Sequence, residues 1–114
     1  MSQNVKAFIK DTAIKTFTSE EFKKNETVQL TDTSYHIRSF YVYLCCQENY
    51  QIRNGERCYV AVVNILGNSL KGDGFQKLLE RFNDHFYIVL DNIIVVGKSG
   101  KDEYAFPPGR IDIF

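Results

Sequence analysis

Two tyrosines, Tyr41 and Tyr43, stand two residues apart in a run of aromatic and β-branched residues. Alternate residues of a β-strand point to the same side, so both rings are expected on one face of a sheet. Proteins that bind single-stranded nucleic acid stack bases on such rings, and each stacked base contributes about 1–3 kcal/mol. The alternative is that both tyrosines are half-buried sheet residues or lie under an N-terminal arm, because aromatic residues are favoured in strands generally.

Basic side chains elsewhere in the chain could contact phosphates beside such a face. Arg38 and Arg53 flank the tyrosines, and Lys98 and Lys101 lie in a later turn. Together with polar residues expected on the same face, they form the set predicted to bind nucleic acid or a protein partner: Arg38, Tyr41, Tyr43, Gln47, Arg53, Asn64, Lys98 and Lys101.

The residue types that usually carry catalysis or bind metals show no supporting pattern. His36 and His85 are far apart and lack a ligand-like spacing, and the cysteines do not form a Cys-x-x-Cys motif. Aspartates and glutamates are scattered over expected caps and turns, with no pair spaced for acid–base chemistry. The loop Gly67–Gly74 lacks the Gly-Lys-Ser/Thr ending of a phosphate-binding loop. We therefore expect no catalytic site, no metal and no cofactor.

The three cysteines, Cys45, Cys46 and Cys58, indicate a reducing environment. Their number is odd, and neighbouring strand residues point to opposite faces, so Cys45 and Cys46 are poor disulfide partners. Reduced thiols in an intracellular protein, in the cytoplasm or the nucleus, are the expectation. Neither a signal peptide nor a run of about 18 apolar residues is visible, so no membrane contact is expected.

Length and charge narrow the class of protein. At 114 residues the chain is expected to be one domain, residues 1–114, in which residues 1–17 form an N-terminal arm or an edge strand. Its formal net charge is zero. A neutral chain has no strong basic field, which argues against charge-driven binding to duplex DNA or to anionic membranes.

Two strands joined by a tight turn, within residues 35–66, form the predicted centre of the fold. Asn54-Gly55 between two apolar runs indicates a type I′ hairpin, with Arg53 opposite Glu56 and pairing continuing outward from there. One face of this hairpin is apolar and is expected to face the core: Phe40, Val42, Leu44, Cys46, Tyr50, Tyr59, Ala61, Val63 and Ile65. The other face is mixed: Tyr41, Tyr43, Cys45, Gln47, Gln51, Arg53, Glu56, Val60, Val62 and Asn64.

The flanking sequence predicts helices and further strands. A capping box at Thr18–Glu21 opens a short helix, and apolar residues at i, i+3, i+4 and i+7 from Phe75 to Phe82 predict a second helix. Residues 86–90 and 93–96 are strand-like, with a kink, bulge or tight turn at Asp91-Asn92. After a turn at 97–102, a last strand (104–106 and 110–114) is broken by Pro107-Pro108-Gly109.

The order of these elements resembles one known family. A helix at Gly74–Phe82, a strand at Phe86–Gly97, a turn at Lys98–Lys101 and a final strand at Arg110–Phe114 resemble the OB-fold domains of the replication protein A type. The resemblance covers roughly residues 57–114. The chain departs from the family in two ways, because only one clear strand precedes the helix and the usual basic excess is missing.

These patterns predict a mainly β protein with one or two short helices, arranged as a small antiparallel OB-like barrel. An open antiparallel α+β sheet with helices on one face is the alternative. The resemblance implies a non-enzymatic OB-like module in a complex that binds single-stranded nucleic acid, acting by base stacking or as a scaffold subunit. The alternative function is a small protein-interaction module, such as an accessory, inhibitor or immunity protein, that binds a protein partner or forms a homodimer and has no nucleic-acid role.

Overall fold

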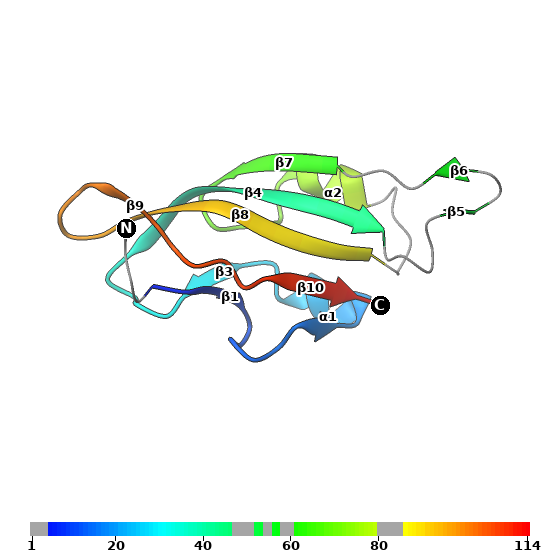
Figure 1. Cartoon of the computed structure of the whole chain (residues 1–114), viewed down its shortest axis with the longest axis horizontal. Coiled ribbons are helices and arrows are strands. Elements are labelled where there is room, and N and C mark those ends of the chain that lie inside the picture. Colours follow the sequence, from blue (N-terminus) through cyan, green and yellow to red (C-terminus); the bar gives the residue numbers. More distant parts are fainter. Residues whose placement is uncertain (1–4, 47–51, 54–55, 58–60, 80–85) are drawn as a thin grey trace.

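The computed structural model describes residues 5–46, 52–53, 56–57, 61–79 and 86–114. Strands dominate this part of the chain, and two short helices accompany them (Figure 1). The prediction of a mainly β protein with one or two short helices is therefore confirmed.

Two long antiparallel strands form the centre of the largest sheet. They are β4 (His36–Cys46) and β8 (Phe86–Val96), which pair along almost their whole length. Both are rich in β-branched and aromatic residues, which favour strands. β7 (Ala61–Leu66) pairs antiparallel with the other edge of β4. The hairpin predicted within residues 35–66 thus supplies β4 and β7.

The C-terminal residues extend the sheet on the far side of β8. β9 (Asp102–Tyr104) and β10 (Arg110–Ile113) both pair antiparallel with β8, so the predicted last strand is present and is broken at the prolines. β2 (Thr16–Phe17) pairs with β10 in parallel. The prediction of a purely antiparallel sheet is therefore wrong at this edge. Two strands joined by a tight hairpin must be antiparallel. β2 and β10 are far apart in the sequence, so their pairing can be parallel. The strand order is β2-β10-β8-β4-β7, with β9 also on β8.

β8 continues as a single strand through Asp91-Asn92, where it contains a β-bulge. Asn92 has a φ of 52°, in the left-handed region that asparagine tolerates better than most residues. Buried positions are even-numbered before the bulge, ending at Leu90, and odd-numbered after it, at Ile93 and Val95. The bulge therefore lets apolar side chains face the core on both sides of it. Of the three possibilities predicted at this point, the structure shows the bulge.

The tip of the hairpin has the predicted pairing. β5 (Ile52–Arg53) and β6 (Glu56–Arg57) form an antiparallel pair in which Arg53 lies opposite Glu56. The Asn54-Gly55 turn itself lies outside the described residues. In Figure 1 this pair extends beyond the right-hand end of the large sheet.

The body of the hairpin does not continue the register of the tip. Leu44 lies opposite Ala61, whereas pairing continued from the tip would place it opposite Ile65. The predicted continuous ladder is therefore wrong, because seven residues (45–51) separate the two ladders on the first strand and only three (58–60) on the second. The difference is even, so each side chain keeps its predicted face.

The apolar face of the hairpin is the core side, as predicted. Its described side chains are buried or partly buried: Phe40, Val42, Leu44, Ala61, Val63 and Ile65. Side chains of the mixed face are exposed or half-buried at Tyr41, Tyr43, Val62 and Asn64.

Cys45 is the exception on the mixed face. Its side chain is buried and its thiol is free. It lies opposite Tyr87 on β8, and a ring of that size can cover a small neighbouring side chain. Register places Cys45 on the mixed face, as predicted, and the structure shows that its side chain is covered there.

The N-terminal residues belong to two different sheets. β1 (Ala7–Ile9) pairs antiparallel with β3 (Val28–Leu30) in a two-stranded sheet. Val5 joins this packing, and its side chain is buried with those of Ala7 and Ile9. β2 follows at one edge of the large sheet. The described part of the N-terminal region is thus packed against the core.

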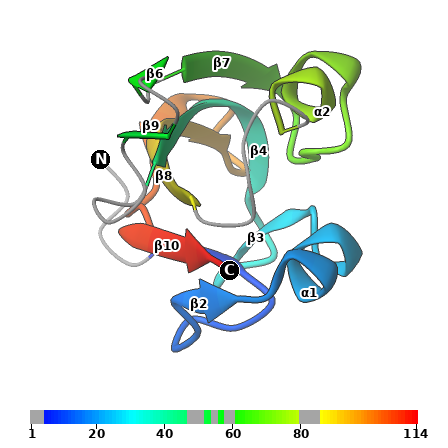
Figure 2. The same ribbon diagram turned by 90° about the vertical axis from the view of Figure 1, so that its right-hand side faces the viewer.

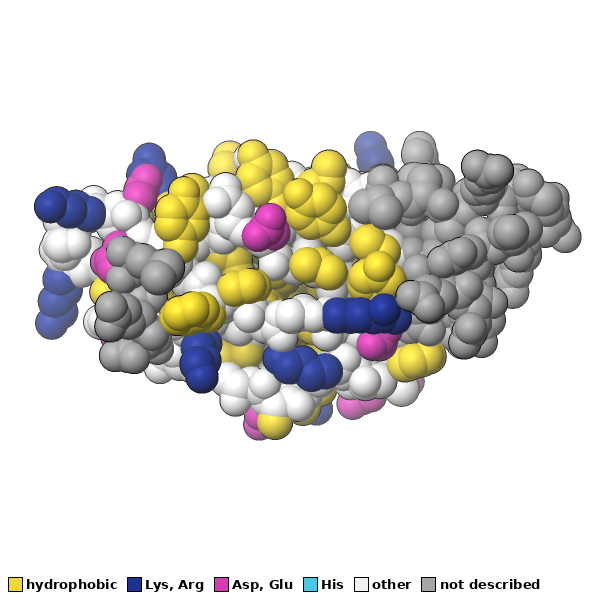
Figure 3. Space-filling view, in the orientation of Figure 1, with side chains coloured by type: hydrophobic (Ala, Val, Ile, Leu, Met, Phe, Trp, Pro, Cys, Tyr) yellow, Lys and Arg dark blue, Asp and Glu magenta, His cyan; other side chains and the backbone are white. Residues whose placement is uncertain are grey.

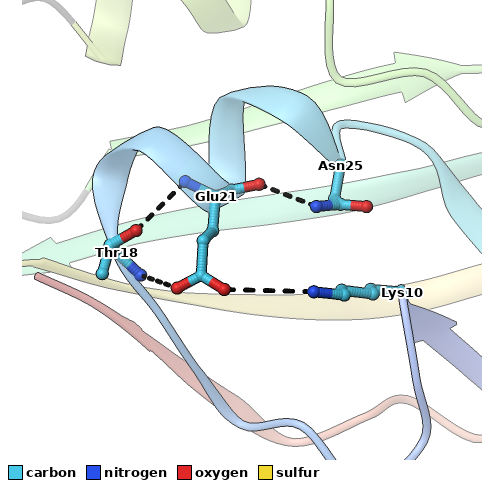
Figure 4. Close-up of polar contacts among 4 residues, drawn as sticks. All are labelled: Lys10, Thr18, Glu21 and Asn25. Carbon is cyan, nitrogen blue, oxygen red and sulfur yellow. Dashed lines mark hydrogen bonds and ion pairs between the residues drawn. The ribbon is translucent and has the colours of Figure 1, made fainter.

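The helix α1 (Ser19–Lys24) begins with the predicted capping box (Figure 4). The Glu21 N–H donates to Thr18 Oγ1 at 3.1 Å, and the Thr18 N–H donates to Glu21 Oε1 at 3.2 Å. The Thr18 backbone N–H first, and the Thr18 hydroxyl second, hold the pKa of the Glu21 carboxyl below its ordinary value. A cap of this kind typically contributes about 1 kcal/mol, which matters for a helix of six residues.

Both helices supply an aromatic ring to the same core. Phe22 of α1 is buried, and so is Phe75 of α2 (Asp73–Leu79). Leu79 is partly buried against this core, as its spacing from Phe75 predicts. The predicted continuation of α2 to Phe82 lies outside the described residues.

Backbone hydrogen bonds join the two-stranded sheet to the large one at two places. At the proline break, the Phe106 N–H donates to the Val5 carbonyl and the Ala7 N–H donates to the Phe106 carbonyl, each at 2.9 Å. After β7, residues 68–70 bond residues 26–28 in a similar way. Figure 2 shows the strands around the core in an end-on view. The sheets in the described part of the chain are nevertheless open, so the predicted OB-like barrel is not confirmed.

Two glycines allow a test of how tightly this fold is packed. A Cβ added at Gly97 would lie 2.7 Å from Cε1 of the Tyr35 ring, which packs against the core. We expect Gly97→Ala to lower the free energy of unfolding by about 1–3 kcal/mol, the usual effect of overpacking.

Gly74→Ala is the matched control, because Gly74 lies in α2 and an added Cβ would have nothing within 4 Å. Since alanine is the better helix former, this change should raise the free energy of unfolding by about 0.5–1 kcal/mol. Urea denaturation of the parent and both variants measures the two effects. A Gly97→Ala variant as stable as the parent would contradict the contact with Tyr35.

Candidate interaction surface

The outer face of the large sheet carries a group of apolar side chains. Register places Tyr43 between Val62 and Val89, and it places Leu66 and Ile94 on either side of Ser39. Ile94 in turn lies opposite Tyr104. We call this group the outer patch: Tyr41, Tyr43, Val62, Leu66, Val89, Ile94 and Tyr104.

Several members of the outer patch are well exposed. The exposed fraction is 81% for Leu66, 53% for Val62, 49% for Tyr104 and 37% for Tyr41. Figure 3 shows hydrophobic side chains gathered over β7, β4 and β8 on this side of the molecule. Large apolar side chains exposed together, and not singly, are typical of a binding surface.

Polar groups enter the outer patch beside Tyr41. Asn64 lies opposite Tyr41 on β7, and Asp91 lies opposite it on β8. Both of these side chains are exposed. The structure thus brings together three of the residues predicted to bind a ligand, Tyr41, Tyr43 and Asn64. It also adds a carboxylate, which would repel the phosphates of a nucleic acid stacked on Tyr41.

The predicted basic residues do not gather beside the tyrosines. Lys98 and Lys101 are exposed in the turn between β8 and β9, whereas Arg53 lies in β5 beyond the opposite end of the sheet (Figure 1). Arg38 Nη1 donates to Asp102 Oδ1 at 2.8 Å, which offsets its charge. Gln47, the remaining member of the predicted set, lies outside the described residues. The predicted arrangement of cations around the tyrosines is therefore not present among the described residues.

A cation that the sequence did not single out lies on the same side of the sheet. The Arg110 guanidinium carbon lies 3.9 Å from the centre of the Tyr87 ring, and Arg110 Nη2 donates to Asp112 Oδ1 at 2.9 Å. The alternation Arg110-Ile111-Asp112-Ile113 could have placed Arg110 and Asp112 on one face of a strand. It could not have identified Tyr87, because that contact depends on the pairing of β10 with β8.

Glu26 is the buried charged residue of the described chain, and it ties three segments together. Gln76 Nε2, from α2, donates to Glu26 Oε2 at 2.8 Å and to the Leu70 carbonyl at 2.9 Å. The Leu70 N–H donates to the Glu26 carbonyl at 2.7 Å. Burial raises the pKa of Glu26, and the Gln76 hydrogen bond partly opposes this. These hydrogen bonds explain why a charged residue is buried here: Glu26 holds neighbouring segments together.

A shallow hollow of about 350 Å³ opens between β3 and the start of β4. Apolar and polar side chains line it together: Val28, Gln29, Leu30, Thr33, Tyr35, His36, Ile37 and Asn68. His36 is the one histidine in this lining. Within the ranges that the structure describes, no three His, Cys, Asp or Glu side chains lie close enough together to hold a metal ion.

Comparisons of this chain with models of protein families, with curated proteins and with solved structures found no match. Neither described helix has the length and apolar character needed to cross a membrane. The function of the outer patch therefore has to be inferred from its own geometry and charge.

The buried carboxyl of Glu26 leads to a prediction about pH. Its pKa in the folded chain lies above the ordinary value of 4.5, so the folded state binds this proton more tightly than the unfolded state does. Stability contributed by this group is therefore highest below about pH 4.5 and falls as pH rises through the raised pKa. We expect Glu26→Gln to remove that fall while its amide oxygen still accepts from Gln76.

Urea denaturation of the parent and the variant across pH 4–8 measures this effect as the difference between two profiles. The difference isolates Glu26 from groups such as Glu21 and Asp32, whose pKa values are lowered by hydrogen bonds. Glu20→Gln, at an exposed position on α1, is the matched control for replacing a glutamate by a glutamine. Parallel profiles for the parent and Glu26→Gln would exclude a buried charge of this kind.

Proposed function

We propose that this chain is a non-enzymatic protein-interaction module that binds a partner through the outer patch. The exposure of Leu66 and Val62, beside the half-exposed Tyr41, carries this proposal. Covering a large apolar side chain of this kind releases about 1.5–3 kcal/mol. The patch lies on regular strands, so it is held in shape before any partner binds.

The charge of the chain supports apolar contact as the binding mode. Formal net charge is zero. Asp91 lies beside Tyr41, whereas Asp102 and Asp112 are each paired with an arginine, Arg38 and Arg110 respectively. Interfaces between proteins typically have an apolar centre with charges kept to the rim. We further expect the protein to be intracellular and to bind no cofactor; both remain predictions.

An OB-like module in a single-stranded nucleic-acid complex is the second candidate. Tyr41 and Tyr43 on one face favour it, as do the hydrogen bonds that join the two-stranded sheet to the large sheet at both ends. An OB-like barrel needs such links. The separation of Lys98 and Lys101 from Arg53 counts against base stacking in a basic groove and leaves the scaffold role as the stronger form of this candidate.

A charge placed in the outer patch tests the proposed function. Leu66→Lys should weaken binding of a protein partner at least about tenfold, because a buried lysine loses the apolar contact and must be desolvated. Thr12→Lys, at an exposed turn far from the patch in sequence, is the matched control. A partner retained by the parent and by the control is purified, and its affinity for all three proteins is measured by calorimetry.

Fluorescence anisotropy of a labelled 20-nucleotide single strand separates the two candidates. The proposed function predicts no saturable binding at tens of micromolar protein. Saturable binding that is lost in the Tyr41→Ala/Tyr43→Ala double variant would instead favour the nucleic-acid candidate. A purified partner that binds the parent and Leu66→Lys equally well would show that the outer patch is not the binding surface.

A further inference from the structure

The backbone of β7 presents an edge on the side away from β4. The Gly67 N–H donates to the Arg38 carbonyl at 2.9 Å, so this pair belongs to the hydrogen-bonded set of the β4–β7 ladder. Hydrogen-bonded pairs alternate with the others in an antiparallel ladder, so Ile65 and Val63 belong to the same set. The backbone groups of the intervening residues, Val62, Asn64 and Leu66, therefore point away from β4.

This edge is open in the described part of the chain along the length of β7. β7 is the last strand in the order of the large sheet. Beyond Leu66 the chain changes direction at Gly67, which has a φ of 84°, and residues 68–70 then pair with residues 26–28. In residues 62–66, backbone donors and acceptors thus face away from β4. The segment that follows, residues 68–70, is already paired with residues 26–28.

β7 lacks the features that usually protect an edge strand. Its sequence, Ala-Val-Val-Asn-Ile-Leu, contains no charge, proline or glycine. Charged residues, prolines and bulges are the common means of preventing an exposed edge from pairing with another chain. β2, at the opposite edge of the sheet, is only two residues long. β7 is therefore the edge suited to strand addition.

We propose that β7 of one copy pairs antiparallel with β7 of a second copy, about a two-fold axis at Asn64. This inference rests on the proposed interaction function and names the partner. The outward-facing residues are symmetric about Asn64, so Val62 of one copy lies opposite Leu66 of the other. Side chains of such a pair lie on the same face, so the most exposed residue of the outer patch gains an apolar neighbour.

The uncharged sequence of β7, symmetric about Asn64 in its outward-facing residues, favours a second copy as the occupant. A strand with no charged residue meets no like charge when it pairs with itself, and two chains of zero formal net charge do not repel each other at long range. Asn64 would lie opposite itself, and an amide side chain can both donate and accept, so the identical groups are compatible. The two large sheets would then be continuous through the paired β7 strands.

A charge exchange at the two-fold axis tests this register. We expect the parent chain to dimerise in sedimentation equilibrium, and we expect N64K and N64D each to raise the dimer dissociation constant at least tenfold. Opposite charges directly across a strand pair attract and like charges repel, so an equimolar mixture of N64K and N64D should form a heterodimer. Thr12→Lys is the control for added charge and should dimerise like the parent.

Amide hydrogen exchange on the parent chain provides a measurement that needs no variant. The N–H groups of Val62, Asn64 and Leu66 should exchange more slowly as protein concentration rises, whereas those of Val63 and Ile65, already bonded to β4, should change little. A parent chain that stays monomeric at several hundred micromolar would overturn the dimer. So would a dimer that forms equally well in N64K, or concentration-independent exchange at Val62, Asn64 and Leu66.

The dimer and the proposed function can fail separately. A monomeric parent chain whose binding to a different purified protein is lost in Leu66→Lys would exclude the dimer and keep the interaction function. A dimer that follows the predicted charge exchange, in a chain that binds no other protein, would identify self-association as the role of this surface.

Discussion

The antiparallel pairing of β4 with β8 is the interaction on which the rest of this structure depends. Each of these strands has a second neighbour, β7 for β4 and the β9–β10 segment for β8, so the sheet grows outward from their ladder. Their inward side chains, including Val42 and Leu90, lie in one core with Phe22 of α1 and Phe75 of α2. Because the helices and the two-stranded sheet all contribute to that core, no described element covers the other side of the central strands. The outer patch is thus a direct result of covering the sheet on one side.

Much of this architecture follows from patterns that extend over only a few residues. Alternation of apolar residues identified the core side of β4 and β7, and the spacing of Thr18 and Glu21 identified the start of α1. The register of the hairpin body could not be predicted in the same way, because a shift of an even number of residues leaves the alternation unchanged. The parallel pairing of β2 with β10 was also not predictable, since a strand of two residues is too short for its sequence to indicate which strand it pairs with.

In the outer patch, too, contacts within one hairpin could be predicted from the sequence, whereas contacts between distant strands could not. Tyr41, Tyr43 and Asn64 share a face because of residue parity within one hairpin, which the sequence contains. The positions of Lys98 and Arg53 relative to these tyrosines depend on the direction and order of whole strands, which the sequence pattern does not contain. The sequence pattern does not single out Arg110 either, because its contact with Tyr87 exists only once β10 lies beside β8.

The position of β10 between β2 and β8 has a consequence for how the chain acquires this structure. Thr16 and Asp112, which face each other across the parallel pair, are separated by most of the sequence, so closing that loop carries a large entropic cost and is expected to come late. Contacts of such long range slow folding. Until β10 is in place, Phe17 lacks its partner strand and one side of β8 is incomplete. An intermediate with β4, β7 and β8 assembled would therefore expose two open sheet edges, at β7 and at β8, and its lifetime would set the tendency of the chain to aggregate during synthesis.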